Sequence, residues 1–91
     1  MSGFVYVLCS ERNGRFYVGS TENLLRRYWR HASGQVKATA RLRPWAMVGW
    51  RENPTTSEAR RVERALKQQK SRLYIERWLA GNWEPVAVIG N

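Results

Sequence analysis

Two short runs of aromatic and β-branched residues lie close together near the start of the chain, in residues 4–9 and 15–20. Asn13 and Gly14 lie in the polar segment between them. An Asn-Gly pair between two such runs is the strongest short-range signal of a β-hairpin, because both residues tolerate the positive φ of a tight turn. We therefore predict that the chain begins with two antiparallel strands. This hairpin constrains the rest of the fold, since so small a sheet needs helices packed on its faces.

Alternation along the first strand predicts which side chains share a face of the sheet. Tyr6 and Leu8 are expected on one face, and Val5 and Val7 on the other. Gly19, near the end of the second strand, indicates a turn or a close approach of the backbone to another group.

The rest of the chain alternates helical and extended patterns. The expected elements are, in chain order, a helix from a Ser20 or Thr21 cap to residue 32, a loop over 33–43, a strand over 45–50, a helix from a Thr56 or Ser57 cap, and a last helix around 73–79. This order predicts an α+β fold, a three-stranded antiparallel sheet flanked by helices in the order β-β-α-β-α-α. One domain is expected over residues 1–91, with its core over about 4–80 and a tail over 81–91.

The chain is strongly basic, with a formal net charge of +9, and thirteen of its sixteen basic residues are arginine. A guanidinium offers a planar fork of donors that matches phosphate oxygens better than an ammonium does. A small domain this basic most often binds nucleic acid. The alternatives are an acidic protein partner or a membrane surface. The sequence has no long basic amphipathic helix with a bulky apolar face, which disfavours the membrane.

Other chemically reactive side chains are few. All seven acidic residues are glutamate, and His31 and Cys9 are the single histidine and the single cysteine. This inventory excludes a four-ligand zinc site and an internal disulfide, and it disfavours a two-metal site of clustered carboxylates. A lone cysteine favours a reducing compartment, so a cytoplasmic location is expected. An enzyme with this inventory would combine one carboxylate with tyrosine, histidine and arginine.

Taken one at a time, the candidate residues have ordinary interpretations. A strand tyrosine is usually a half-buried packing residue. Arg27 and His31 lie one helical turn apart and would each be a surface residue, and Glu63 would pair with Lys67. For the basic loop we favour contact with nucleic acid, and for the two tryptophans of the next strand we favour the core; these residues are Lys37, Arg41, Arg43, Trp45 and Trp50.

Together, these residues form a series that resembles the GIY-YIG nuclease family. The two triplets that carry the resemblance are Phe4-Val5-Tyr6 and Tyr17-Val18-Gly19. Arg27 follows the second triplet by eight residues, His31 comes one turn later, and Glu63 lies on the helix after the third strand. Two further segments, Arg43-Pro44-Trp45 and residues 59–67, are similar to those of short single-domain bacterial members and of structure-specific members. The resemblance covers about residues 4–80.

The resemblance implies a metal-dependent phosphodiester hydrolase with one divalent cation, Mg²⁺ or Mn²⁺, held by Glu63. It implies that Arg27 neutralises charge on the scissile phosphate. Tyr17 or Tyr6 would orient or deprotonate the attacking water, with His31 as general base or relay. The chain departs from the family pattern in three places. Phe4 stands where the first triplet has its glycine, and Ser20 stands where many relatives carry a lysine. No asparagine lies near residue 75, about a dozen residues after the glutamate.

We therefore expect an endonuclease that acts on DNA, with single-stranded or branched DNA favoured because few residues remain to read bases. Selectivity would come from the basic loop, from nucleic-acid shape or from a partner protein. The candidate nucleic-acid contacts are Arg15, Gly19, Ser20, Arg26, Arg30, Lys37, Arg41 and Arg43. Two alternatives stay open: a non-catalytic nucleic-acid-binding module with the same fold, and an adaptor for an acidic protein.

Overall fold

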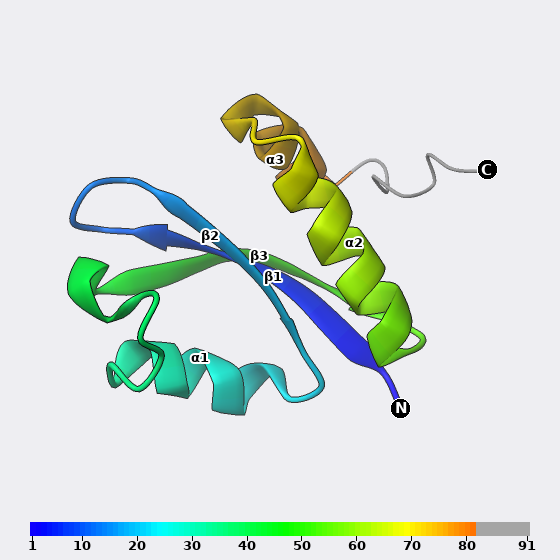
Figure 1. Cartoon of the computed structure of the whole chain (residues 1–91), viewed down its shortest axis with the longest axis horizontal. Coiled ribbons are helices and arrows are strands. Elements are labelled where there is room, and N and C mark those ends of the chain that lie inside the picture. The colour runs from blue at the N-terminus through cyan, green and yellow to red at the C-terminus, as the bar shows by residue number, and fades with distance from the viewer. Residues whose placement is uncertain (82–91) are drawn as a thin grey trace.

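Both strands of the predicted hairpin form in the computed structural model, which describes residues 1–81 of the chain (Figure 1). The elements are, in chain order, β1 (Gly3–Ser10), β2 (Phe16–Thr21), α1 (Leu24–Ala32), the short 3-10 helix η1 (Ala40–Leu42), β3 (Trp45–Asn53), α2 (Thr56–Gln68) and α3 (Arg72–Leu79). The predicted α+β fold and its element order are thus confirmed. Residues 82–91, which hold most of the expected tail, lie outside the described residues.

The hairpin turn is closed by backbone hydrogen bonds around Gly14. The Gly14 N–H donates to the Ser10 carbonyl at 2.8 Å, and the Ser10 N–H donates to the Arg15 carbonyl at 2.8 Å. Gly14 adopts a φ of 77°, which L side chains rarely tolerate. The Ser10 hydroxyl oxygen accepts from the N–H groups of Arg12 and Asn13, so the turn is tied to the end of β1.

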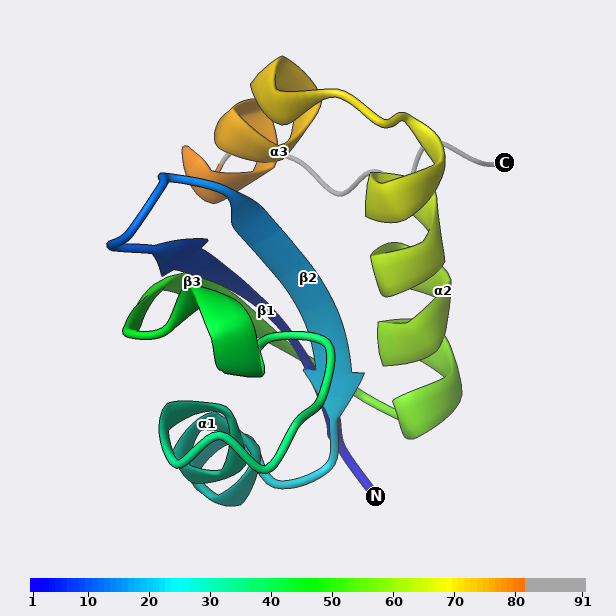
Figure 2. The same cartoon turned by 60° about the vertical axis from the view of Figure 1, so that its left-hand side comes forward.

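The sheet order is β2-β1-β3, and all pairs are antiparallel. β1 is therefore the central strand, and its residues Val5, Tyr6, Val7 and Leu8 are fully buried. Figure 2 shows α1 on one face of the sheet and α2 with α3 on the other. β2 forms one edge of the sheet, between α1 and α2.

Alternation along β1 divides the hydrophobic core in two, as predicted. Val5 and Val7 pack with Val18 against the buried residues of α2 and α3, which are Ala59, Val62, Leu66, Ile75 and Trp78. Tyr6 and Leu8 pack with Trp45 on the opposite face, where α1 covers them through Leu24 and Tyr28. The sheet thus carries a core on each face, and the tyrosines belong to the α1 side.

The predicted helix caps were wrong in both long helices. β2 continues through Thr21, which pairs with Phe4, so α1 cannot begin before Asn23. The Asn23 side chain accepts a hydrogen bond from the Arg26 N–H at 3.0 Å and is the true cap. In α2 the cap is Thr55, whose hydroxyl accepts from the Glu58 N–H.

Three further expectations need correction. β3 extends three residues beyond the predicted strand, because Arg51 to Asn53 continue to pair with β1. The predicted loop over 33–43 contains η1. Trp45 is buried as expected, but Trp50 on β3 is 55% exposed. No helix within residues 1–81 is long and apolar enough to cross a membrane.

Candidate active site

Tyr6 and Tyr17 lie on neighbouring strands, and both side chains point to the α1 face of the sheet. Tyr6 pairs with Gly19 in the β1–β2 register, and Leu8 pairs with Tyr17. The two tyrosine rings are 6.5 Å apart between centroids. The His31 ring of α1 contacts both of them edge-on, at 5.6 Å from Tyr6 and 5.1 Å from Tyr17. The hairpin and α1 therefore build one aromatic cluster.

His31 is fully buried in this cluster, unlike the surface histidine that the residue taken alone would suggest. Its Nε2 lies 2.8 Å from the Tyr6 hydroxyl, and its Nδ1 lies 2.8 Å from the Thr39 hydroxyl. The Thr39 hydroxyl also donates to the Val36 carbonyl at 3.3 Å, so it accepts from Nδ1–H. That assignment leaves Nε2 as the acceptor of the Tyr6 proton.

The environment of His31 keeps its ring neutral. Burial lowers the pKa of His31 to about 4, and the positive charges of Arg27 and Arg30 act in the same direction. A neutral imidazole with one N–H agrees with the hydrogen-bond chain from Tyr6 through His31 to Thr39. At neutral pH His31 therefore fixes the orientation of the Tyr6 phenol without carrying a charge.

Tyr6 is held tightly on its other side by Gly19. A Cβ atom at position 19 would overlap the Tyr6 hydroxyl and the end of its ring, so glycine is needed here for space. Burial raises the pKa of Tyr6 to about 12; the nearby Tyr17 adds to this rise, and Arg27 opposes it. Tyr6 is thus a protonated, buried phenol at neutral pH.

Tyr17 differs from Tyr6 in its surroundings. It is only partly buried, and its hydroxyl has no hydrogen-bond partner among residues 1–81. Its ring contacts Trp45 on one side, and the Lys67 ammonium lies 5.8 Å from the ring centroid. Of the two phenols, Tyr17 is the one that solvent or substrate can reach.

Glu63 reaches β2 from α2, and both of its carboxylate oxygens have protein partners. The Ser20 hydroxyl of β2 donates to Oε1, and the Lys67 ammonium lies 2.7 Å from Oε2. The pair of Glu63 with Lys67, predicted from their i, i+4 spacing, is confirmed. Lys67 lies between the Glu63 carboxylate and the ring of Tyr17. The negative charge of Glu63 also acts to raise the pKa of Tyr6.

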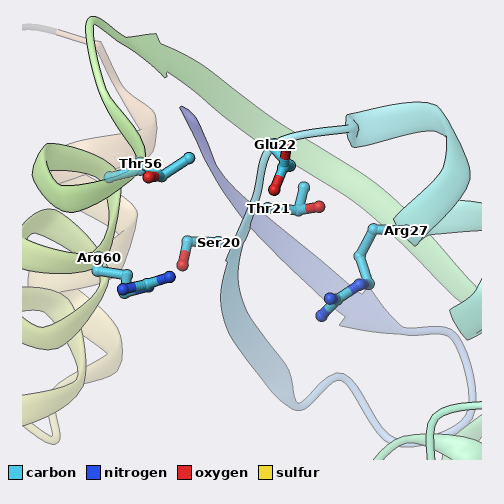
Figure 3. Close-up of a pocket in the computed structure, with 7 residues that line it drawn as sticks. Ser20, Thr21, Glu22, Arg27, Thr56 and Arg60 are labelled. Carbon is cyan, nitrogen blue, oxygen red and sulfur yellow. The ribbon is translucent and has the colours of Figure 1, made fainter. Parts of the chain in front are cut away.

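Arg27 and Arg60 lie on either side of the end of β2. They line a hollow of about 240 Å³ together with Ser20, Thr21, Glu22, Thr56 and Ala59. Figure 3 shows the Arg27 side chain coming from α1 and Arg60 from α2, with Ser20 between them. Because Ser20 also donates to Glu63, this hollow adjoins the carboxylate.

The structure thus brings together the residues Tyr6, Tyr17, Arg27, His31 and Glu63, from β1, β2, α1 and α2. The candidate nucleic-acid contacts are more dispersed. Gly19 and Ser20 border the cluster, and Arg15, Arg41 and Arg43 line a separate hollow beside the hairpin turn. Arg26, Arg30 and Lys37 are exposed, and they line neither this hollow nor the one between Arg27 and Arg60.

Three residues of this site were missed by sequence reasoning. From the sequence, Lys67 was assigned only to an ion pair. In the structure it also places a positive charge beside Tyr17. Many relatives were expected to carry such a charge on the residue after the second triplet. Arg60 lies on the same helical face as Glu63 and Lys67. The spacing of three and four residues between them predicts that they share this face. Thr39 has no sequence signal, because only the fold brings it to His31.

The chain is similar to a known family and to a solved structure. The family model described as the GIY-YIG catalytic domain matches residues 2–75. The solution NMR structure of the UPF0213 protein BH0048 from Bacillus halodurans is similar to the chain, with 30% sequence identity and a TM-score of 0.57. That match covers 100% of this chain and 99% of the other. No match was found among curated proteins.

Proposed function

The chain belongs to the GIY-YIG family, and from that membership we propose that it is an endonuclease that hydrolyses phosphodiester bonds in DNA with one bound divalent cation. The observation that carries this proposal is the approach of Tyr17, Arg27 and Glu63 to one edge of the sheet. The three side chains come from three different elements. Ser20 lines the same hollow as Arg27, and its hydroxyl donates to Glu63.

Glu63 is the residue that would hold the cation. No group of three or more metal-binding side chains occurs within residues 1–81, so a cage made only of protein ligands is not available there. Mg²⁺ and similar ions commonly bind through one or two carboxylates, several waters and a substrate phosphate. The single carboxylate of Glu63, with the Ser20 hydroxyl beside it, fits this mode. A bound cation would supply positive charge for the phosphate and lower the pKa of a bound water.

Arg27 is the residue that would receive the negative charge of the phosphate. Its guanidinium faces the hollow at the end of β2, opposite Arg60 (Figure 3). A planar donor fork matches two oxygens of one phosphate, and its charge stabilises the additional charge of the transition state.

Tyr17, rather than Tyr6, is the phenol that would contact the attacking water. Its hydroxyl has no protein partner among residues 1–81, whereas the Tyr6 proton is directed at His31. Removal of the Tyr6 proton is also unfavourable, because burial raises its pKa to about 12. We assign Tyr6 and His31 a positioning role: they hold the aromatic cluster against which Tyr17 packs.

The substrate we propose is single-stranded or branched DNA. The site lies on an exposed sheet edge with arginine on both sides, and these residues bind phosphate rather than base edges. Such contacts select backbone shape and charge, not sequence.

A second candidate function is a nucleic-acid-binding module without catalysis. The observation that favours it is that both oxygens of Glu63 already have protein partners, Ser20 and Lys67. In that case Glu63 would organise a basic surface, and DNA would bind without being cleaved.

The test is cleavage of single-stranded, duplex and branched DNA in Mg²⁺, in Mn²⁺ and in EDTA. We expect cleavage only with metal, and Glu63→Ala and Arg27→Ala should each lower the rate by at least about a hundredfold. Thermal unfolding in EDTA checks that the protein stays folded when the metal is removed.

The matched controls are Glu58→Ala and Arg61→Ala, which remove an exposed ion pair from α2 itself. Both should cleave like the parent. Equal activity of the parent, Glu63→Ala and Arg27→Ala would refute the assignment. Salt-sensitive binding without cleavage of any substrate would favour the second candidate.

A further inference from the structure

One face of α2 is a row of basic residues beside the candidate site. Arg60, Arg64 and Lys67 follow one another on α2 at spacings of three or four residues, and Glu63 lies among them. Lys70 comes two residues after the end of the helix. All four basic side chains are exposed. Lys67 pairs with Glu63, but Arg60, Arg64 and Lys70 have no acidic partner within residues 1–81. Their charges are therefore available to an external anion.

Four hollows in the described part of the chain share basic residues with their neighbours, and two of them are lined by β2. The hollow between Arg27 and Arg60 adjoins one of about 410 Å³ on α2, which Arg60 also lines. Lys67 and Lys70 connect the latter to a hollow of about 520 Å³ beside Tyr17.

The series continues to the other end of the strand. Arg15 belongs both to the hollow beside Tyr17 and to one of about 840 Å³ next to the hairpin turn. The last hollow is lined by further arginines, which are Arg12, Arg41 and Arg43. We call this connected series, from Arg27 and Arg60 to Arg15 and Arg43, the β2 track.

The β2 track carries a strong positive charge. Basic residues line every hollow, and Glu22 and Glu63 are the acidic residues among the linings. Arg72 contributes less than its position suggests, because it pairs with Glu76, donates to the Gly14 carbonyl and packs on Phe16. The charges that a ligand can use are thus mainly those of α2, Arg27 and the hairpin turn.

We propose that one nucleic-acid backbone lies along the β2 track, with Arg60 and Arg27 at one end, Lys67 and Lys70 in the middle and Arg15 at the other. This inference rests on the proposed function and adds the path of the substrate strand. The six residues of β2 span about 20 Å at 3.3 Å per residue. Tyr17 and Glu63 lie near the middle of the track.

The residues of the track differ in part from the nucleic-acid contacts that the sequence predicted. Arg26, Arg30 and Lys37 were candidate contacts but line none of the four hollows, and Arg60, Arg64 and Lys70 were not candidates. The two sets each contain two arginines and one lysine, so they can be compared at equal net charge.

The experiment measures binding of a fluorescent single-stranded oligonucleotide in EDTA, over a range of salt concentrations. The track variant is Arg60→Gln/Arg64→Gln/Lys70→Asn; asparagine is chosen because Lys70 has a φ of 49°. The comparison variant is Arg26→Gln/Arg30→Gln/Lys37→Asn. Each phosphate contact contributes about 0.7 to the slope of log K against log salt. We expect the track variant to lose about 1.4 to 2.1 from that slope, and the comparison variant to keep most of it.

Thermal unfolding of both variants checks that each is folded. A comparison variant that loses as much slope as the track variant would overturn the path, and so would a track variant with the slope of the parent. Because the assay contains EDTA, it does not depend on cleavage. If the slopes behave as expected while no substrate is cleaved in metal, the nuclease proposal fails and the path stands.

Discussion

At the scale of single residues, Tyr6 and Gly19 fit closely against one another. The ring of Tyr6 occupies the space that a side chain at position 19 would need. On its other side the Tyr6 hydroxyl bonds to His31, so the ring cannot move away without breaking that bond. The position of the aromatic cluster therefore depends on a glycine that takes no part in chemistry.

We expect Gly19→Ala to abolish DNA cleavage and to lower the free energy of unfolding by about 1 to 3 kcal/mol, the usual cost of overpacking. The added methyl group must displace Tyr6, and His31 and Tyr17 with it. The measurements are urea unfolding and the cleavage assay. Val18→Ala is the control, since it weakens the same strand from its opposite face. Cleavage by Gly19→Ala at the rate of Val18→Ala would contradict this account.

His31 predicts a pH dependence of stability. The unfolded histidine takes up a proton near pH 6.5, whereas in the folded protein its pKa is lowered to about 4. Between these values the unfolded state binds more protons, so stability falls as the pH falls. The loss over this window is at most about 3 kcal/mol.

The measurement is urea unfolding of the parent and of His31→Gln between about pH 7 and about pH 4.5. The glutamates titrate in both proteins, so the difference between the two curves isolates the histidine. We expect a steeper loss of stability in the parent on acidification. Parallel curves would show that His31 is not a buried neutral group.

At the scale of elements, α2 combines a buried face with a charged one. Ala59, Val62 and Leu66 pack on the sheet, while Arg60, Glu63 and Lys67 border β2 on the outside. The spacing of three and four residues places both sets without help from any other element. This helix therefore controls how the carboxylate of Glu63 is neutralised.

We expect Lys67→Met to bind Mn²⁺ about two- to fivefold more tightly, since an exposed ion pair contributes up to about 1 kcal/mol and a tenfold change in affinity is about 1.4 kcal/mol. The reason is that a cation at Glu63 competes with the Lys67 ammonium for Oε2. Mn²⁺ binding is measured by electron paramagnetic resonance in the absence of DNA.

Arg61→Met is the control for this comparison, because Arg61 pairs with Glu58 and not with Glu63. It should bind Mn²⁺ like the parent. Unchanged or weaker binding by Lys67→Met would mean that the ammonium does not occupy the cation position.

Local patterns predicted the elements well and their surroundings less well. The period of two along β1 placed Tyr6 and Leu8 on the correct face, because that period follows from the backbone alone. The cap of α1 was predicted too early, since strand pairing of Thr21 with Phe4 competes with helix formation. His31 lies on a helix of nine residues, and only the way that helix crosses the sheet decides which of its sides is buried.

At the scale of the whole molecule, one strand supports both cores. β1 contributes Val5 and Val7 to the α2 side and Tyr6 and Leu8 to the α1 side. A change on either face should therefore weaken both layers together. The candidate site includes residues from both helical layers. Glu63 comes from one side of the sheet, and Arg27 and His31 come from the other.

We expect Leu8→Val and Val7→Ala each to lower the free energy of unfolding by about 1 to 3 kcal/mol. Both should lower the urea midpoint without changing the slope m, because m reports the surface exposed in one cooperative transition. Urea unfolding followed by circular dichroism and by tryptophan fluorescence is the measurement. A smaller m in Leu8→Val alone would show that the α1 layer unfolds separately.

The fit of Tyr6 over Gly19 also has a consequence for how such sequences diverge. The two positions are thirteen residues apart in the chain, yet the volume allowed at one depends on the volume present at the other. Where a descendant replaces the tyrosine with a smaller side chain, the steric reason for the glycine disappears. Substitutions at these two sites should therefore arise as pairs, and a lineage that changes the glycine first must pass through a poorly packed intermediate.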